Sequence, residues 1–127
     1  RTGSFTSTDI ELQSVEMDGS LTQTPEFPYN WMYDGSRSQM PGFEMEITCK
    51  SLFLIFKDSG EMDVGKADVF VNDVYCMTAD PHKNNWLHCN AVLLFWETES
   101  RSHKVRITVT EEDQNKKFTI LGFGYTI

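Results

Sequence analysis

One short stretch, residues 84–90, gathers more polar recognition groups beside a predicted strand than any other segment of the chain. It reads Asn-Asn-Trp-Leu-His-Cys-Asn and combines an indole, an imidazole, a thiol and several amides. The apolar run 91–96 follows it directly. Loops at the ends of core strands are common positions for binding residues, because the strand holds them in place. The stretch is therefore predicted to be a recognition loop, with Trp86 as its aromatic group and His88 and Asn90 as its hydrogen-bonding groups.

A metal site could be drawn from the same part of the chain. His82, His88 and Cys89, joined by Cys76, would supply up to four nitrogen or sulfur ligands. Neighbouring side chains of an extended chain point in opposite directions, so His88 and Cys89 do not converge easily. A structural calcium ion would need an oxygen-rich loop, and no Asp-x-Asp-x-Asp pattern is present. We expect no cofactor, with His88 as a loop donor and Cys89 in the core.

Catalytic motifs are absent from the sequence. It contains no Gly-x-Ser-x-Gly elbow, no Gly-Asp-Ser block, no phosphate-binding glycine loop and no His-Glu-x-x-His pair. The three histidines fit a Ser-His-Asp set only if spacing is ignored. We therefore expect a protein that is not an enzyme.

Aromatic residues offer a third chemistry, stacking on the apolar faces of sugar rings. The candidate carbohydrate-binding residues are Trp31, Tyr33, Tyr75, Trp86 and Trp96, with Asn30, Arg37, His88 and Asn90 as polar neighbours. Trp31 and Trp86 could equally be core side chains that close the ends of a sandwich, because Trp is highly buried on average. Trp96 fits either role, and Tyr125 is expected in the core.

The elements that must position these residues are strands. Residues 43–48 alternate between apolar and polar, and residues 52–56 are apolar on both faces, as in a central strand. Residues 67–71 and 74–77 read as a hairpin joined by Asn72-Asp73, which suits a type I′ turn. Strands are also expected at 91–96, 103–110 and 117–127, with a turn at 97–102. Glycines inside the last strand suggest bends or close backbone approach.

These short strands predict an all-β fold, a jelly-roll β-sandwich of two antiparallel sheets, with almost no helix. The length of 127 residues fits one domain over 1–127, in which 1–24 is an edge strand or loosely ordered. The formal charge of -8 argues against nucleic acid and anionic membranes as partners. Three cysteines without a CxxC pattern favour buried thiols over a disulfide. The chain does not begin with Met, so we expect a mature or excised fragment.

Three segments carry a family resemblance: Trp86-Leu87-His88-Cys89-Asn90-Ala91-Val92-Leu93-Leu94, Ser102-His103-Lys104-Val105-Arg106-Ile107, and Lys117-Phe118-Thr119-Ile120-Leu121-Gly122-Phe123-Gly124-Tyr125. They resemble the non-catalytic β-sandwich module attached to SGNH/GDSL-type carbohydrate esterases of plant-fibre-degrading anaerobic bacteria. Residues 27–31, 43–54 and 65–72 also resemble that module, so the resemblance extends from about Pro25 to Ile127. Trp96 departs from the pattern, where an acidic residue is expected, and could add a stacking platform.

The resemblance implies a secreted, extracellular jelly-roll module that binds a plant cell-wall polysaccharide such as β-glucan, xyloglucan or a related β-linked glycan. It also implies a catalytic domain in the same parent polypeptide as partner, and we expect the module to be a monomer. The alternative is a structural accessory domain that packs against an esterase or glycoside hydrolase domain without binding sugar. Exposed rings in a groove with polar groups would favour the first reading, and rings on a flat apolar face would favour the second.

Overall fold

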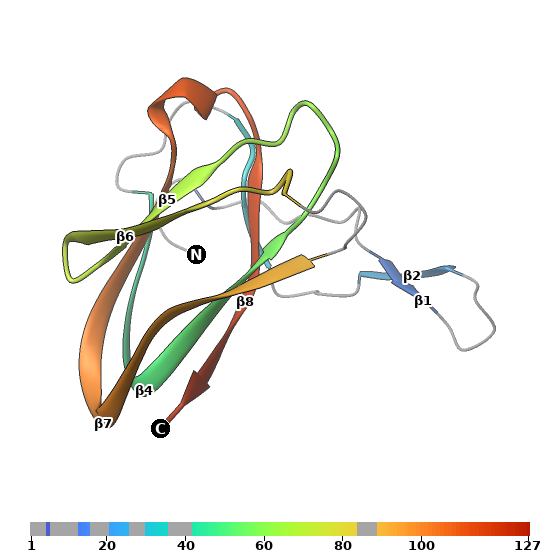
Figure 1. Cartoon of the computed structure of the whole chain (residues 1–127). Helices are drawn as coiled ribbons and strands as arrows, with labels where there is room; N and C mark the ends of the chain where they lie inside the picture. The colour runs from blue at the N-terminus through green and yellow to red at the C-terminus, as the bar shows by residue number, and fades with distance from the viewer. Residues whose placement is uncertain (1–4, 6–12, 16–20, 26–29, 36–41, 84–88) are drawn as a thin grey trace.

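The computed structural model describes residues 5, 13–15, 21–25, 30–35, 42–83 and 89–127 (Figure 1). Its strands are β1 (Gln13–Val15), β2 (Leu21–Pro25), β3 (Trp31–Tyr33), β4 (Phe43–Lys57), β5 (Ala67–Val71), β6 (Val74–Ala79), β7 (Cys89–Val109) and β8 (Phe118–Thr126). A single 3-10 turn, η1 (Glu111–Asp113), follows β7. The expected all-β class is confirmed. None of the described residues belongs to a helix long and apolar enough to cross a membrane.

Six strands form one antiparallel sheet in the order β3-β8-β4-β7-β5-β6, and β1 pairs separately with β2. Within the segment 1–24, expected to be an edge strand or loosely ordered, the structure describes Phe5, β1 and most of β2, and the rest lies outside the described residues. The long strands β4 and β7 pair with each other from end to end, and the second half of β4 also pairs with β8. Two separate sheets of a jelly roll are therefore not confirmed.

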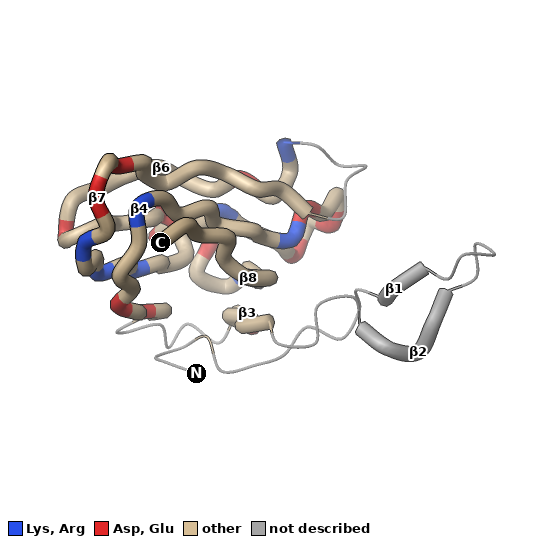
Figure 2. The backbone as a smooth tube through the Cα atoms, turned by 90° about the horizontal axis from the view of Figure 1, so that it is seen from below, with Lys and Arg blue, Asp and Glu red and all other residues tan. Residues whose placement is uncertain are grey.

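A bend divides this sheet into two halves. Cys49 pairs with Arg101 and Ser51 pairs with Trp96, so residues 97–100 of β7 lie opposite Lys50 alone. Extra residues on one strand bend it and increase its twist. Figure 1 shows β4 and β7 turning together, and Figure 2 shows β6 and β3 on opposite sides with β4 and β8 between them. The turn predicted at 97–102 is thus an irregularity inside β7, and the two strands expected on either side of it are one.

The core lies between the two halves of the sheet and draws on both. Its fully buried members include Val69, Val105 and Ile107 from one half and Leu52, Leu54 and Ile120 from the other. Side chains that alternate inward along these strands meet there, as the period of 2 predicts. Each fully buried apolar side chain contributes about 1.5–3 kcal/mol of transfer free energy, so this core is what holds the sheet folded over.

The hairpin predicted at Asn72-Asp73 is confirmed as β5–β6. Asn72 and Asp73 have φ values of 52° and 65°, as a type I′ turn requires. The Asn72 side chain also fastens the turn to β7: its Oδ1 accepts the Lys104 amide at 3.0 Å, and its Nδ2 lies 2.9 Å from His103 Nδ1. The hairpin is therefore held firmly against the sheet.

The glycines of β8 behave differently from what the sequence suggests. A Cβ on Gly122 would meet nothing within 4 Å, and one on Gly124 would meet only Phe53 Cβ at 3.8 Å. Of the two expected features, the close backbone approach is wrong, whereas the register of β8 against β4 is irregular beside Gly122, between the pairs Ile55–Gly122 and Phe56–Ile120. A close approach occurs at Gly35 instead, where φ is +84° and a Cβ would lie 2.7 Å from the Asn115 carbonyl oxygen. Tyr125, expected in the core, is 55% exposed, because it lies near the end of the strand.

Candidate functional site

A β-bulge in β6 brings Tyr75 and Thr78 to the same face of the sheet. Phe70 pairs with Tyr75 and Asp68 pairs with Thr78, so the extra residue between these pairs lies on β6. Residues three apart on a regular strand point to opposite faces, and the bulge removes that difference. The face in question is the outer one, because the intervening pair Val69–Met77 points toward the core.

The three polar groups on this face form a directed chain of hydrogen bonds. Thr78 Oγ1 donates to Asp68 Oδ1 at 2.6 Å. The Tyr75 hydroxyl lies 2.8 Å from Thr78 Oγ1. Since the Thr78 proton goes to the carboxylate, the Tyr75 hydroxyl must donate to Thr78. The Asp68 carboxylate and the Tyr75 phenol oxygen can each accept further hydrogen bonds. This Tyr75–Thr78–Asp68 cluster can therefore accept hydrogen bonds from the hydroxyl groups of a ligand.

The Tyr75 ring is exposed but held in one orientation. It is 57% exposed, and it meets the Phe70 ring edge-on, with centroids 6.0 Å apart and planes at 76°. Phe70 in turn lies under the Arg106 guanidinium, whose Cζ is 4.2 Å from the ring centroid. A ring fixed by such contacts and by its hydroxyl loses little conformational freedom when a ligand stacks on it.

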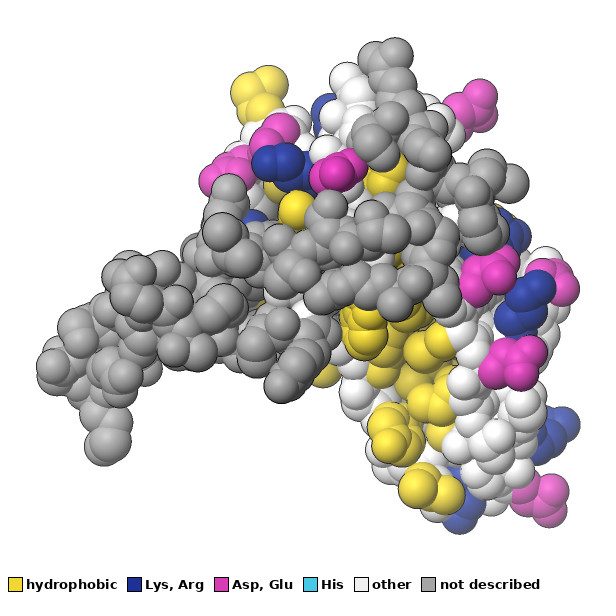
Figure 3. Space-filling model, turned by 180° about the vertical axis from the view of Figure 1, so that it is seen from behind, with side chains coloured by type: hydrophobic (Ala, Val, Ile, Leu, Met, Phe, Trp, Pro, Cys, Tyr) yellow, Lys and Arg dark blue, Asp and Glu magenta, His cyan; other side chains and the backbone are white. Residues whose placement is uncertain are grey.

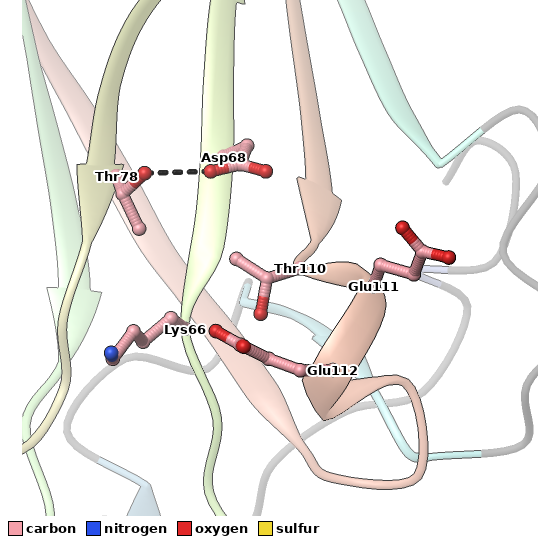
Figure 4. A pocket seen from close by; sticks show the side chains of 6 residues that line it. All are labelled: Lys66, Asp68, Thr78, Thr110, Glu111 and Glu112. Atoms are coloured by element: carbon pink, nitrogen blue, oxygen red, sulfur yellow. Dashed lines mark hydrogen bonds between the residues drawn. The ribbon is translucent and has the colours of Figure 1, made fainter.

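The hydroxyl of Thr78 borders two depressions. The first, the β5–β6 hollow, encloses about 640 Å³ and is lined by Lys66, Asp68, Thr78, Thr110, Glu111 and Glu112 (Figure 4). Figure 4 shows Asp68 and Thr78 joined across neighbouring strands, with Glu112 and Thr110 from the β7–η1 connection nearby. Asp113 anchors that connection, because its Oδ2 accepts the Lys66 amide at 3.0 Å.

The second depression, the β6–β7 cleft, encloses about 490 Å³. Its lining combines an apolar floor with four polar groups: Phe56, Met77, Ala91, Val92, Thr78, Asp80, Lys83 and Asn90. Asn90 is held in place by donating from Nδ2 to Asp58 Oδ2 at 2.6 Å. An apolar cavity of this size with a few fixed polar groups is the usual form of a small-ligand site.

Of the predicted site residues, Asn90 lines the β6–β7 cleft, and Tyr75 is joined to the lining of both depressions by its hydrogen bond to Thr78. Tyr33 and Asn30 are fully buried, and the Tyr33 hydroxyl donates to the Gln114 carbonyl. Trp31 is half-buried and packs against Phe43, with ring centroids 5.4 Å apart. These three side chains therefore lie in or against the core, and we leave them out of the candidate site.

Trp96 lies on a different surface. It is 81% exposed, on the outer face of the other half of the sheet, with Phe53 and Leu93, which are 41% and 50% exposed. Figure 3 views the molecule from behind and also shows hydrophobic side chains gathered at the surface.

The remaining predicted site residues, Trp86, Arg37 and His88, lie outside the described residues.

Several side chains of the site escaped the sequence analysis. Asp68, Thr78 and Lys66 are ordinary surface residues of a hairpin, and Glu111 and Glu112 belong to an acidic connection. The only signal available was the alternation of β5, which places Asp68 on the outer face. The position of Thr78 depends on the bulge, which nothing in the sequence of β6 marks.

The cysteines are free thiols, as expected, although only Cys49 is fully buried. Burial, and secondly the negative charge of Glu97, raise the pKa of the Cys49 thiol, and burial raises the pKa of Cys76. The Cys76 thiol donates to the Leu94 carbonyl at 3.5 Å. Within the described ranges, no three His, Cys, Asp or Glu side chains lie close enough together to hold a metal ion.

No family model matches this chain, and no curated protein and no solved structure is similar enough to it to count as a match. The resemblance to the esterase-attached module is therefore a hypothesis that depends on the residues quoted for it.

Proposed function

We propose that this chain is a non-catalytic carbohydrate-binding module that recognises a β-linked plant polysaccharide at the outer face of the β5–β6 hairpin. The observation that carries the proposal is the exposed, fixed ring of Tyr75, joined through Thr78 to Asp68 where the hollow and the cleft meet. The bent sheet would then act as a jelly-roll-like sandwich whose layers are its two halves. A secreted location and a catalytic domain in the same polypeptide belong to the same proposal.

The arrangement suits a sugar in two respects. A pyranose ring offers an apolar face that can lie on an aromatic ring, and its hydroxyl groups need acceptors beside that ring. Tyr75 supplies the ring, and Asp68 and Thr78 supply acceptors on the same face. The cleft adds Asp80 and Lys83, which follow β6, and Asn90 at the start of β7, so a polymer would have polar groups to contact in the cleft as well as in the hollow.

The test is affinity electrophoresis and calorimetry with soluble xyloglucan, mixed-linkage β-glucan, glucomannan, xylan and pectin. Wild-type protein is expected to bind at least one of them. Tyr75→Ala should weaken that binding about tenfold or more, because it removes both the ring and the phenol group. Absence of binding to every polymer would refute the proposal.

Tyr125→Ala is the matched control. Tyr125 is also an exposed strand tyrosine, 55% accessible against 57% for Tyr75, but it lies near the end of β8. Its replacement should leave glycan affinity unchanged. Equal losses in the two variants would mean that the effect is not specific to the hairpin face.

The face that carries Trp96 favours a second candidate, the structural accessory domain. The surface lies on the outer side of the neighbouring strands β7, β4 and β8. Its exposed side chains are those of Trp96, Phe53 and Leu93. Their neighbours in the register are Ile55, Ala91 and two glycines, Gly122 and Gly124. The exposed side chains of this surface are apolar, which suits a packed protein neighbour better than a hydrated sugar. The occupant we assign is another domain of the same polypeptide.

Trp96→Ser distinguishes the two roles of that face. If it is a domain contact, the variant should show weaker retention on a hydrophobic column and weaker binding of a hydrophobic dye, with unchanged glycan affinity. Loss of glycan binding in Trp96→Ser, with Tyr75→Ala unaffected, would instead place the sugar site on the Trp96 face.

A further inference from the structure

The β5–β6 hollow carries an excess of negative charge. Three carboxylates line it, from Asp68, Glu111 and Glu112, against one ammonium group from Lys66. In the described part of the chain, no ion pair joins Lys66 to any of these carboxylates.

Asp68 has a neutral hydrogen-bond partner within the cluster. The Thr78 hydroxyl donates to its carboxylate and brings no positive charge to it. Arg106, another cation on this face, lies over the Phe70 ring, with its Cζ 4.2 Å from the ring centroid, and stands opposite Glu44 in the register of β4 and β7. Glu111 and Glu112 are exposed on η1. A ligand that enters the hollow therefore meets two to three uncompensated negative charges.

We infer that Asp68, Glu111 and Glu112 make this site selective by charge, so that it accepts neutral glycans and excludes glycans that carry uronic acid or other carboxylate groups. The inference depends on the proposed function, since it concerns the same site. Like charges brought within a few ångströms repel, and in a site of this exposure the effect is screened by salt. The overall charge of -8 acts in the same direction at longer range.

The test uses pairs of polymers that share a β-linked backbone: hydroxyethyl cellulose against carboxymethyl cellulose, and arabinoxylan against glucuronoxylan. The protein should bind the neutral member of a pair about tenfold more tightly at low ionic strength, and the difference should shrink in about 0.5 M salt. The double variant Glu111→Gln/Glu112→Gln should reduce the difference at low salt, with its unfolding midpoint unchanged.

A control variant separates the local effect from net charge. Glu46→Gln/Glu99→Gln removes the same number of charges at exposed positions of β4 and of the β7 bend, outside the lining of the hollow. It should retain the selectivity of the wild type. Equal binding of neutral and carboxylated polymers, or equal effects of the two double variants, would overturn the inference alone. Absence of binding to every polymer, including those tested above, would overturn the proposed function and the inference together.

Discussion

At the scale of single residues, the proposed site depends on the position of Thr78, whose hydroxyl accepts from Tyr75 and donates to Asp68. Thr78→Val keeps the shape of the side chain and removes both hydrogen bonds, so the Tyr75 ring and the carboxylate lose their fixed relation. We expect glycan affinity to fall about tenfold, since each net hydrogen bond contributes roughly 0.5–1.5 kcal/mol. Thr78→Ser should restore most of it, and Thr98→Val on the β7 bend should have no effect. Full affinity in Thr78→Val, measured by calorimetry, would contradict the role of the cluster.

Two carboxylates make stability depend on acid pH. Burial would raise the pKa of Glu97, but hydrogen bonds from His103 and Arg101 and the charges of these residues outweigh it, so the pKa lies below the ordinary value of 4.5. For Asp113, burial is likewise outweighed by the Lys66 amide, Lys116 and Thr110, and the pKa lies below 3.8. Each lowered pKa contributes stability that is complete above the ordinary value and is lost as pH falls through the folded-state value.

The wild type should therefore lose stability below about pH 4.5, beyond the loss shared by all carboxylates. In Glu97→Gln this part of the pH dependence should be absent, so the urea midpoint should change less between about pH 4.5 and about pH 3 than in the wild type. Parallel curves for the two proteins would show that the Glu97 contacts do not persist in solution.

The thiols provide a further residue-scale prediction. Because the pKa values of Cys49 and Cys76 are raised, few of these groups are thiolates at neutral pH, and thiolate is the reactive form. In a Cys89→Ser variant, the two remaining thiols should react with a disulfide reagent at least about tenfold more slowly in the native state than in guanidinium. Native labelling as fast as in the unfolded chain would contradict their placement.

At the scale of elements, two glycines differ in how much space surrounds the position of a Cβ atom: Gly122 in β8 has room for one, and Gly35, which follows β3, does not. Gly122→Val should leave stability unchanged or raise it by up to about 1 kcal/mol, because Val favours strands and its Cβ has room. Gly35→Ala should lower stability by about 2 kcal/mol, because the residue has a positive φ and its Cβ would contact the Asn115 backbone. Denaturant unfolding of the two variants checks both signs, and the reverse order would contradict the structure around β3 and β8.

Local patterns predicted the elements well where a strand and its turn lie together in the sequence. The hairpin at Asn72-Asp73 and the strand ending at Thr126 were predicted because alternation and turn chemistry are local properties. The continuity of β7 through 97–100 was missed, because three extra residues in one strand look like a turn until the pairing of that strand with β4 is known. Thr78 was missed for the same reason: a bulge is defined by the partner strand.

At the scale of the whole molecule, the bend in β4 and β7 separates the aromatic residues that sequence analysis had grouped. Tyr75 lies on one outer face, Trp96 on the other, and Tyr33 in the core between them. Whether a ring is buried depends on how the sheet folds over, which no single segment encodes. The two functions proposed for the chain, sugar binding and domain packing, are therefore assigned to two different surfaces of one molecule.

The most direct test of the central claim is to map the glycan on the protein by amide chemical shifts during titration with a neutral polymer fragment that binds. The account predicts that the largest shifts fall on Asp68, Tyr75 and Thr78, with smaller ones at Asn90 and Glu112, and that Leu93 and Trp96 stay unchanged. Shifts centred on Trp96 and Phe53 would contradict it, because they would place the sugar on the opposite face of the folded sheet.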